Sequence, residues 1–111
     1  MPHAAALLLR SRQLVADGWT QGADARAADG REVDPWADDA VAWSLLGAVV
    51  AALEEQQADA GGELPLGELA VALHALAGFV DDDSLTGWND APRRAQGEVE
   101  AALTAAAAET A

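Results

Sequence analysis

Apolar positions near the start of the chain repeat with a helical period over about residues 4–17. The pair Leu7-Leu8 recurs one heptad later as Leu14-Val15, which places these four side chains on one face of a helix. Gly18 follows, in the position where a residue with a left-handed backbone commonly ends a helix. The pattern therefore predicts an amphipathic helix that ends at Gly18 through a left-handed residue.

The next stretch, about residues 19–34, has no helical period and is predicted to form a short β-hairpin. Its centre is Asp29-Gly30, a dipeptide that favours two-residue hairpin turns because both turn positions require positive φ. The flanking arms contain alanine and charged residues instead of β-branched residues. An irregular loop is therefore the alternative interpretation of this stretch.

A second helix is predicted from Asp34-Pro35 to about Gln57, since aspartate is a good N-cap and proline fits the first helical turn. Its apolar face is wide, which indicates a central helix with neighbours on more than one side. A glycine at position 47 costs about 1 kcal/mol relative to alanine inside a helix, so we expect another backbone or a tryptophan ring to approach it closely. The residues of this face are Trp36, Ala40, Val41, Trp43, Leu45, Leu46, Gly47, Val49, Val50 and Leu53.

Two further helices complete the predicted elements. A linker over residues 56–63 leads to a third helix at roughly 65–80, and a fourth helix follows Trp88-Asn89-Asp90-Ala91-Pro92. Asn89 or Asp90 can cap the fourth helix, with the proline in its first turn. The C-terminal tail, about residues 105–111, is expected to fray.

Together these elements predict a mainly α-helical single domain over residues 1–111, with four helices and a short β-hairpin between helices 1 and 2. The length fits one domain, because two domains would each be too small to bury a core without disulfides or metals. The predicted core contains Leu8, Leu14, Trp19, Trp43, Leu46, Val50, Leu69, Leu73, Leu76, Trp88, Val99 and Leu103.

The charge balance is strongly acidic. Among 111 residues, 6 are basic and 19 are acidic, which gives a formal net charge of -13 at pH 7. Such a charge argues against direct binding to nucleic acid or to an anionic membrane, whose phosphates would repel it. All basic residues are arginine and alanine is abundant, which is typical of a GC-rich genome and explains the charge as compositional background. Salt adaptation, DNA mimicry and a basic partner are the alternatives.

Signals for export or membrane insertion are missing from the sequence. The apolar run at residues 4–9 is too short for a secretory signal, and no stretch approaches the ~20 apolar residues of a membrane span. The absence of cysteine excludes a disulfide scaffold, cysteine catalysis and thiolate metal sites. We therefore expect a cytoplasmic protein that does not associate with membranes.

Residues suited to catalysis or metal binding are few and isolated. His74 has no histidine or carboxylate three or four positions away, and His3 is terminal. The segment that begins at Asp81-Asp82-Asp83 resembles the start of a calcium loop, but its fifth and sixth positions are Leu85 and Thr86, where a ligand and a glycine are required. No serine lies in a G-x-S-x-G context. The sequence therefore predicts no catalytic residue, no metal and no cofactor, and it favours a non-enzymatic protein.

One aromatic and polar cluster remains as a candidate ligand-binding site. Two arginines closely follow a tryptophan, and a helix N-terminus with nearby arginine attracts anions. The structural alternative is that the tryptophan fills the core while the asparagine and aspartate close a helix N-terminus, where the aspartate competes with a bound anion. The candidate residues are Trp43, Trp88, Asn89, Asp90, Arg93 and Arg94.

Several short motifs occur in a characteristic order along residues 7–104. They are W-x-Q-G-A at 19–23, A-D-G at 28–30, S-L-x-G-A at 44–48 and W-N-D-x-P at 88–92, of which Trp88-Asn89-Asp90 is the most specific. This order resembles a small domain family of unknown function that is common in actinobacteria and their phages. The resemblance implies an intact single domain of bacterial or phage origin, and it implies no activity.

Three functions stay open at this point. We favour a non-enzymatic accessory or protein-interaction domain, with an unknown protein partner or self-association, because catalytic groupings are missing and the small chain holds four tryptophans. The first alternative is a small-molecule binding module with a pocket between helices near Trp88. The second is an acidic decoy of a DNA-binding protein, which requires carboxylates along one face at phosphate-like spacing.

Overall fold

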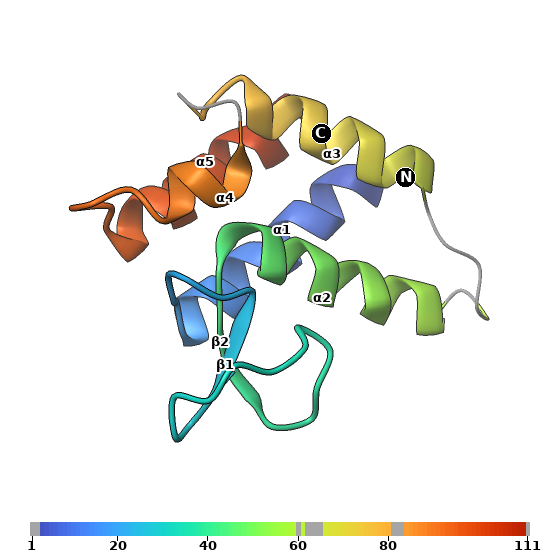
Figure 1. Ribbon diagram of the computed structural model, residues 1–111. Helices are drawn as coiled ribbons and strands as arrows, with labels where there is room; N and C mark the ends of the chain where they lie inside the picture. Colours follow the sequence, from blue (N-terminus) through green and yellow to red (C-terminus); the bar gives the residue numbers. More distant parts are fainter. Residues whose placement is uncertain (1–2, 60, 62–65, 81–83, 111) are drawn as a thin grey trace.

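A computed structural model describes residues 3–59, 61, 66–80 and 84–110, and it shows a mainly helical chain (Figure 1). A two-stranded antiparallel sheet lies between the first two helices, so the predicted fold class is confirmed. A short helix adds to the four expected ones. The elements are α1 (His3–Asp17), β1 (Ala25–Ala27), β2 (Ala40–Trp43), α2 (Leu45–Asp59), α3 (Leu66–Ala77), α4 (Leu85–Asn89) and α5 (Gln96–Thr110).

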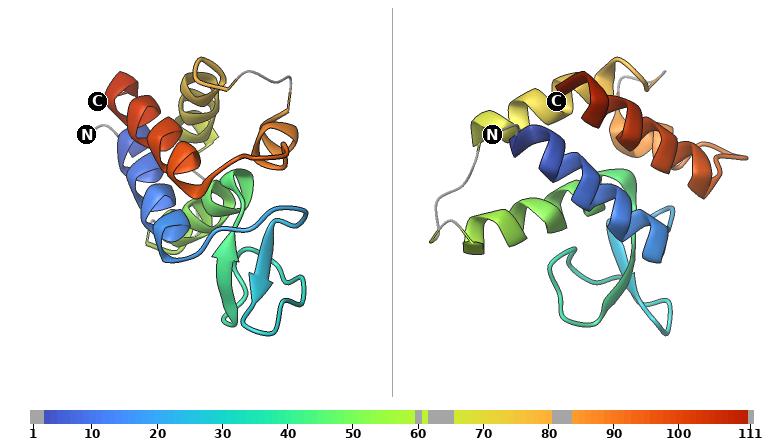
Figure 2. Two further views of the ribbon diagram at one scale, coloured as in Figure 1. Left: turned by 90° about the vertical axis from the view of Figure 1, so that its left-hand side faces the viewer. Right: turned by 180° about the vertical axis from the view of Figure 1, so that it is seen from behind.

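Helix α1 is the centre of the helical part. It contacts α5, α2 and α3, and the views in Figures 1 and 2 show these helices gathered around it, with the strands and their loops at one end. Leu7, Leu8 and Val15 on α1 are fully buried. Alanines fill much of the remaining core, because their small side chains let helices approach closely. The buried alanines that join the core cluster are Ala4, Ala48, Ala51, Ala52, Ala72, Ala75, Ala102, Ala106 and Ala107.

The predicted core residues are all shielded, to different degrees. The buried group is Leu8, Leu14, Leu76, Trp88, Val99 and Leu103. The half-buried group is Trp19, Trp43, Leu46, Val50, Leu69 and Leu73.

On the surface, Arg10 on α1 donates two hydrogen bonds to the carboxylate of Glu55 on α2, at 2.7 and 2.9 Å, and this raises the pKa of the guanidinium.

The β unit differs in extent from the predicted hairpin. Strand β1 pairs with β2, and because β2 begins at Ala40 the paired region extends beyond the predicted limit at residue 34. The turn at Asp29-Gly30 is present: the NH of Gly30 donates to Ala27 O at 2.9 Å. Gly30 has a φ of 87°, whereas Asp29 does not have positive φ. Instead, its carboxylate accepts a hydrogen bond from the backbone NH of Arg31 at 3.0 Å, which lowers the pKa of Asp29.

The prediction of a helix beginning at Asp34-Pro35 was wrong. Residues 34–39 form turns, β2 follows, and α2 begins only at Leu45. The spacing of apolar residues fits a helix, but the backbone of Trp43 pairs with distant segments: its NH donates to Gly18 O at 3.0 Å, and its carbonyl accepts from Thr20 N at 3.2 Å. These tertiary bonds outweigh the local helical preference.

The N-terminus of α2 is capped by Ser44 instead of Asp34. The buried Ser44 hydroxyl accepts a hydrogen bond from the NH of Gly47 at 3.0 Å, as an N-cap side chain does. The predicted close approach at Gly47 is confirmed for a backbone: a Cβ at this position would overlap the carbonyl oxygen of Asp24. Strand β1 therefore begins directly beside the first turn of α2.

Gly18 has a different role from the predicted one. Its φ is not in the left-handed region, which among the described residues is occupied by Gly22, Gly30, Gly61 and Arg93. A Cβ on Gly18 would instead overlap the carbonyl oxygen of Val41 on β2. The glycine is required by the close contact between the end of α1 and the sheet, and the predicted left-handed cap was wrong.

The segment around Trp88 is also organised differently from the prediction. Trp88 and Asn89 lie inside α4, and α5 begins at Gln96, so Asn89, Asp90 and Pro92 do not form the N-terminus of the last helix. The carboxylate of Glu98 caps that end by accepting from the NH of Ala95 at 2.9 Å.

The tail is helical to the end of the described region. Helix α5 continues to Thr110, and Ala106 and Ala107 are buried, so the predicted fraying from residue 105 is not seen as far as Thr110. Alanine has the highest helix propensity, and contacts with α1 and α3 hold this helix in place.

Two parts of the sequence prediction lie outside the described residues: the start of the third helix at Pro65 and the aspartates 81–83. None of the described helices combines the length and hydrophobicity needed to cross a bilayer.

Candidate functional site

The Trp19 motif and the Trp88 motif of the sequence meet at the side chain of Asn89. Its Oδ1 accepts hydrogen bonds from Trp19 Nε1 at 2.8 Å and from the NH of Leu45 at 3.0 Å. Its Nδ2 donates to Thr20 O at 3.1 Å and to Asp90 Oδ1 at 3.0 Å. These four bonds use the full capacity of an amide side chain, and Asn89 is completely buried.

Further hydrogen bonds join the same two segments, residues 19–22 and 88–91, which we call the Asn89 junction. Gln21 Nε2 donates to the carbonyl oxygens of Asn89 and Ala91, at 2.9 and 3.0 Å. The NH of Gly22 donates to Asp90 Oδ1 at 3.0 Å. Carbonyl groups at a helix C-terminus have no partner within the helix, so Gln21 supplies one at the end of α4.

Arg94 lies over the ring of Trp88. The guanidinium carbon lies 3.9 Å from the centroid of the Trp88 ring, in cation–π geometry. Its Nε donates to Trp88 O at 2.9 Å, and its Nη1 forms an ion pair with Glu98 at 3.0 Å. Trp88 itself is only 6% exposed. Two of the three guanidinium nitrogens of Arg94, Nε and Nη1, thus already hold partners within the chain.

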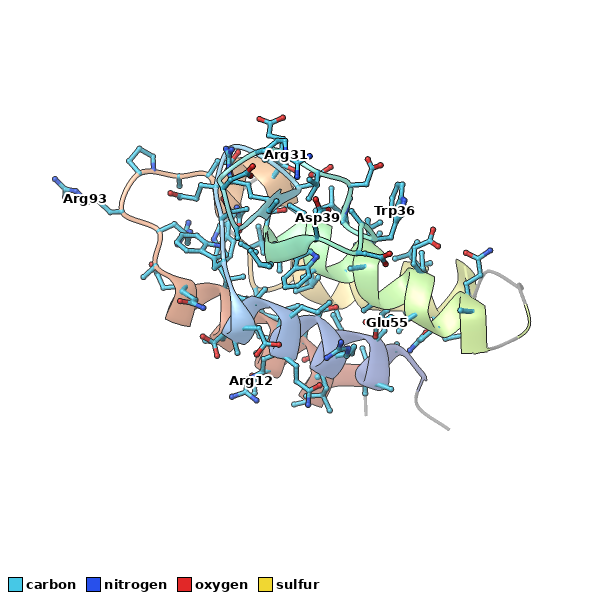
Figure 3. All side chains as sticks on the ribbon, turned by 90° about the horizontal axis from the view of Figure 1, so that it is seen from below. Arg12, Arg31, Trp36, Asp39, Glu55 and Arg93 are labelled. Atoms are coloured by element: carbon cyan, nitrogen blue, oxygen red, sulfur yellow. The ribbon has the colours of Figure 1, made fainter. Side chains whose placement is uncertain are left out.

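The other two candidate residues lie apart from this group. Arg93 is exposed, has a φ of 70° and projects away from the body of the protein (Figure 3). The half-buried indole of Trp43 donates from Nε1 to Pro35 O at 3.0 Å. The structure therefore brings together Trp88, Asn89, Asp90 and Arg94, with Trp43 and Arg93 directed elsewhere.

The contacts of the Asn89 junction favour the structural interpretation of the cluster. Its polar atoms bind one another, and no buried side-chain nitrogen or oxygen of the described residues lacks a hydrogen-bond partner. Two surface pockets of about 440 and 400 Å³ are lined by other residues. The larger is formed by Val71, His74, Ala75, Gly78, Phe79, Glu109 and Thr110, and the smaller by Ala23, Asp24, Glu32, Val33, Asp34 and Pro35.

The most unusual surface residue is Trp36, which sequence reasoning placed in the seam of a central helix. The structure leaves 56% of this side chain exposed. It lies on residues 34–39, which we call the tryptophan loop, between β1 and β2 (Figure 3). The turn-forming and acidic residues around the tryptophan, Asp34-Pro35 and Asp38-Asp39, are the signal that could have indicated a loop.

Several contacts brace the tryptophan loop. Pro35 is buried, and its carbonyl accepts the indole hydrogen bond from Trp43. Two turns are closed by hydrogen bonds from Ala37 N to Asp34 O and from Ala40 N to Ala37 O, at 3.0 and 3.1 Å. The exposed indole of Trp36 therefore stands on a loop whose backbone is hydrogen-bonded on both sides of it.

Acidic side chains lie on the tryptophan loop and in the pocket that adjoins its first residues. Asp24, Glu32 and Asp34 line the 400 Å³ pocket, and Asp38 is exposed on the loop itself. None of these four carboxylates forms an ion pair with a described residue. Within the described part of the chain there is also no group of three or more side chains placed to hold a metal ion.

Comparison with known proteins identifies one family. Residues 1–109 match the model of DUF6197, described as a family of unknown function. No curated protein matches the chain, and no solved structure matches it. The resemblance to a domain family of unknown function is confirmed by this match, which covers nearly the whole chain.

Proposed function

The chain belongs to DUF6197, a family of unknown function, and from its surface we propose that it is a non-enzymatic protein-interaction domain. The tryptophan loop is the surface that meets the partner. The compositional bias and the resemblance in motif order support a bacterial or phage origin. A cytoplasmic location is part of the same proposal.

The exposed indole of Trp36 is the observation that carries this proposal. A covered tryptophan buries roughly 150–250 Å², so its exposed half leaves about 2–3 kcal/mol of hydrophobic stabilisation unused at ~25 cal/mol per Å². Tryptophan is also enriched among the residues that dominate binding energy at interfaces. Because hydrogen bonds already brace the loop, binding of a partner would cost little conformational entropy in this chain.

The two alternative functions have less support. A pocket near Trp88 would have to compete with the hydrogen bonds of Asn89 and the cation–π contact of Arg94. A decoy of DNA requires carboxylates along one face. Exposed carboxylates instead occur at the end of α1, on α2 and at both ends of α5, as well as on the loops; the helical ones are Asp17, Glu54, Glu55, Glu98 and Glu109.

Photo-crosslinking tests the proposal directly. A photoreactive phenylalanine analogue replaces Trp36 in the full chain, which is then irradiated in a lysate of cells that express the chain naturally. We expect one discrete crosslinked protein, which excess wild-type chain competes away and the Trp36→Ala variant does not. The control places the same analogue at Val71 on α3, which is also an exposed apolar residue.

Two results would contradict this function. One is the absence of any crosslink at position 36 that wild-type chain can compete away. The other is an identical set of crosslinked proteins from positions 36 and 71, since that would reflect general stickiness of exposed apolar residues. Circular dichroism of each variant confirms that the fold is retained, which we expect because both side chains are exposed.

A further inference from the structure

We propose that the partner of the tryptophan loop is a basic protein segment, which packs an apolar side chain on Trp36 and directs arginine or lysine to the carboxylates around it. This inference rests on the proposed function and adds the chemistry of the partner. It is carried by the juxtaposition of an exposed apolar centre with unpaired carboxylates.

The apolar centre of this surface is the indole of Trp36, which is 56% exposed. Hydrogen bonds close two turns in the loop that carries it, and strand β2 begins at Ala40, immediately after the loop. A partner that covers the indole gains hydrophobic stabilisation without first ordering the loop.

The carboxylates around this centre give it a strongly negative charge. Asp34 and Asp38 stand two positions before and after Trp36 in the chain, and both are exposed. Asp24 and Glu32 line the adjoining pocket together with Asp34, and its volume of about 400 Å³ is large enough for a guanidinium or ammonium group. Like charges held close together repel one another, and a cation between them relieves that repulsion.

The arginines of the chain itself leave these carboxylates without a cation. Arg26 donates to Thr20 Oγ1 at 3.0 Å and to the carbonyls of Gln21 and Gly30 at 3.3 and 2.9 Å. Arg31 pairs with Asp29 and Asp39, the latter at 2.7 Å. Arg12 and Arg93 lie at other sides of the molecule, well apart from Trp36 in Figure 3.

A basic partner fits this surface better than a second copy of the chain. Two copies that met through their tryptophan loops would bring the same acidic groups together, in molecules with a net charge of -13 each. Such a contact is disfavoured by repulsion, whereas a partner of opposite charge is attracted and oriented by the same field. Charge complementarity therefore selects a basic occupant.

A library of random peptides displayed on phage provides a defined probe. The full chain is immobilised, and bound peptides are sequenced, synthesised and measured by calorimetry against wild type, Trp36→Ala and the double variant Asp34→Asn with Asp38→Asn. The matched control is Glu54→Gln with Glu109→Gln, which changes the net charge equally at exposed sites on α2 and α5.

We expect the selected peptides to combine arginine or lysine with an aromatic or aliphatic residue. Trp36→Ala should weaken their binding by about tenfold or more, as loss of a central interface tryptophan does. The loop double variant should weaken binding by about three- to tenfold, with less sensitivity to added salt, and the control pair by less than about twofold.

Three outcomes overturn the inference in distinguishable ways. Peptides that require Trp36 but carry no excess of basic residues refute the basic partner and leave the proposed function intact. If binding of basic peptides is weakened equally by the loop double variant and by the control double variant, the peptides are attracted generally to an acidic protein. That result refutes a specific docking site. If no selected peptide depends on Trp36, both the inference and the proposed surface fail.

Discussion

At the scale of single residues, the side chain of Asn89 connects more of the chain than any spacing in the sequence indicates. Its two polar atoms bind the indole of Trp19, the backbone of Thr20, the first NH of α2 at Leu45 and the carboxylate of Asp90. It joins the segment after α1 and the start of α2 to the short helix α4. A buried group with so many partners is costly to remove, because each partner then loses its hydrogen bond away from water.

Replacing Asn89 by alanine is therefore expected to lower the free energy of unfolding by about 2–4 kcal/mol. The physical reason is that the indole NH of Trp19, the NH of Leu45 and the carbonyl of Thr20 all lose their partner in a buried setting. Urea unfolding followed by circular dichroism measures the change as a shift in the midpoint.

The matched control for this variant is Gln13→Ala, which removes an exposed amide on α1. It should change the free energy of unfolding by less than about 0.5 kcal/mol. Equal midpoints for the Asn89 and Gln13 variants would show that the hydrogen bonds of the Asn89 junction contribute nothing to stability.

At the scale of the elements, two glycines set how closely the sheet meets the helices. Gly18, after α1, touches the backbone of β2, and Gly47, in the first turn of α2, touches the backbone next to β1. The NH of Ser44 also donates to Asp24 O at 3.0 Å, beside Gly47. The small sheet is thus bound to the ends of two helices by backbone contacts that leave no room for a Cβ.

Substituting Gly47 by alanine should destabilise the protein by about 1–3 kcal/mol, even though alanine is the better helix former. The added methyl group would overlap the carbonyl oxygen of Asp24, so α2 and β1 would have to separate. Thermal unfolding of the variant measures the effect as a fall in Tm.

Gly97→Ala is the control on α5, where a Cβ meets no atom within 4 Å. This substitution should leave Tm unchanged or raise it, because only the helix propensity changes. The expected gain in the free energy of unfolding is at most about 1 kcal/mol. A stabilising effect of alanine at both positions would contradict the close contact between α2 and the residue before β1.

At the scale of the whole molecule, a core rich in alanine surrounds α1, and the tryptophans gather toward the sheet and α4. Trp19, Trp43 and Trp88 lie in or beside the Asn89 junction or on β2, while the helices contribute most of the secondary structure. The Asn89 junction connects these two parts. We propose that the chain folds as one cooperative domain, as its length also favours.

This proposal predicts that tryptophan fluorescence and far-ultraviolet circular dichroism report the same urea midpoint and the same slope. The first signal follows the sheet and α4, and the second follows the helices. Two separated midpoints would refute a single cooperative domain and would show that the sheet region unfolds independently of the helices.

The periodic apolar pattern alone predicted α1, the middle of α3 and the body of α5, together with part of the core, whose buried alanines were absent from the predicted core residues. These helices satisfy their backbone hydrogen bonds internally, so their side-chain spacing carries the required information. The same pattern misplaced residues 34–43, where backbone groups of Trp43 bind Gly18 and Thr20, which are more than 20 positions away.

The candidate site was likewise predicted only in part from the sequence. The sequence singled out Trp88-Asn89-Asp90 as specific. Only the fold shows that the side chain of Asn89 binds partners from two distant segments, residues 19–20 and Leu45. It also placed Trp36 on the apolar face of a central helix, and only the tertiary structure exposes it. Local periodicity determines which face of a helix is apolar. Contacts between distant segments decide whether a segment is helical at all, and therefore which tryptophan is left at the surface.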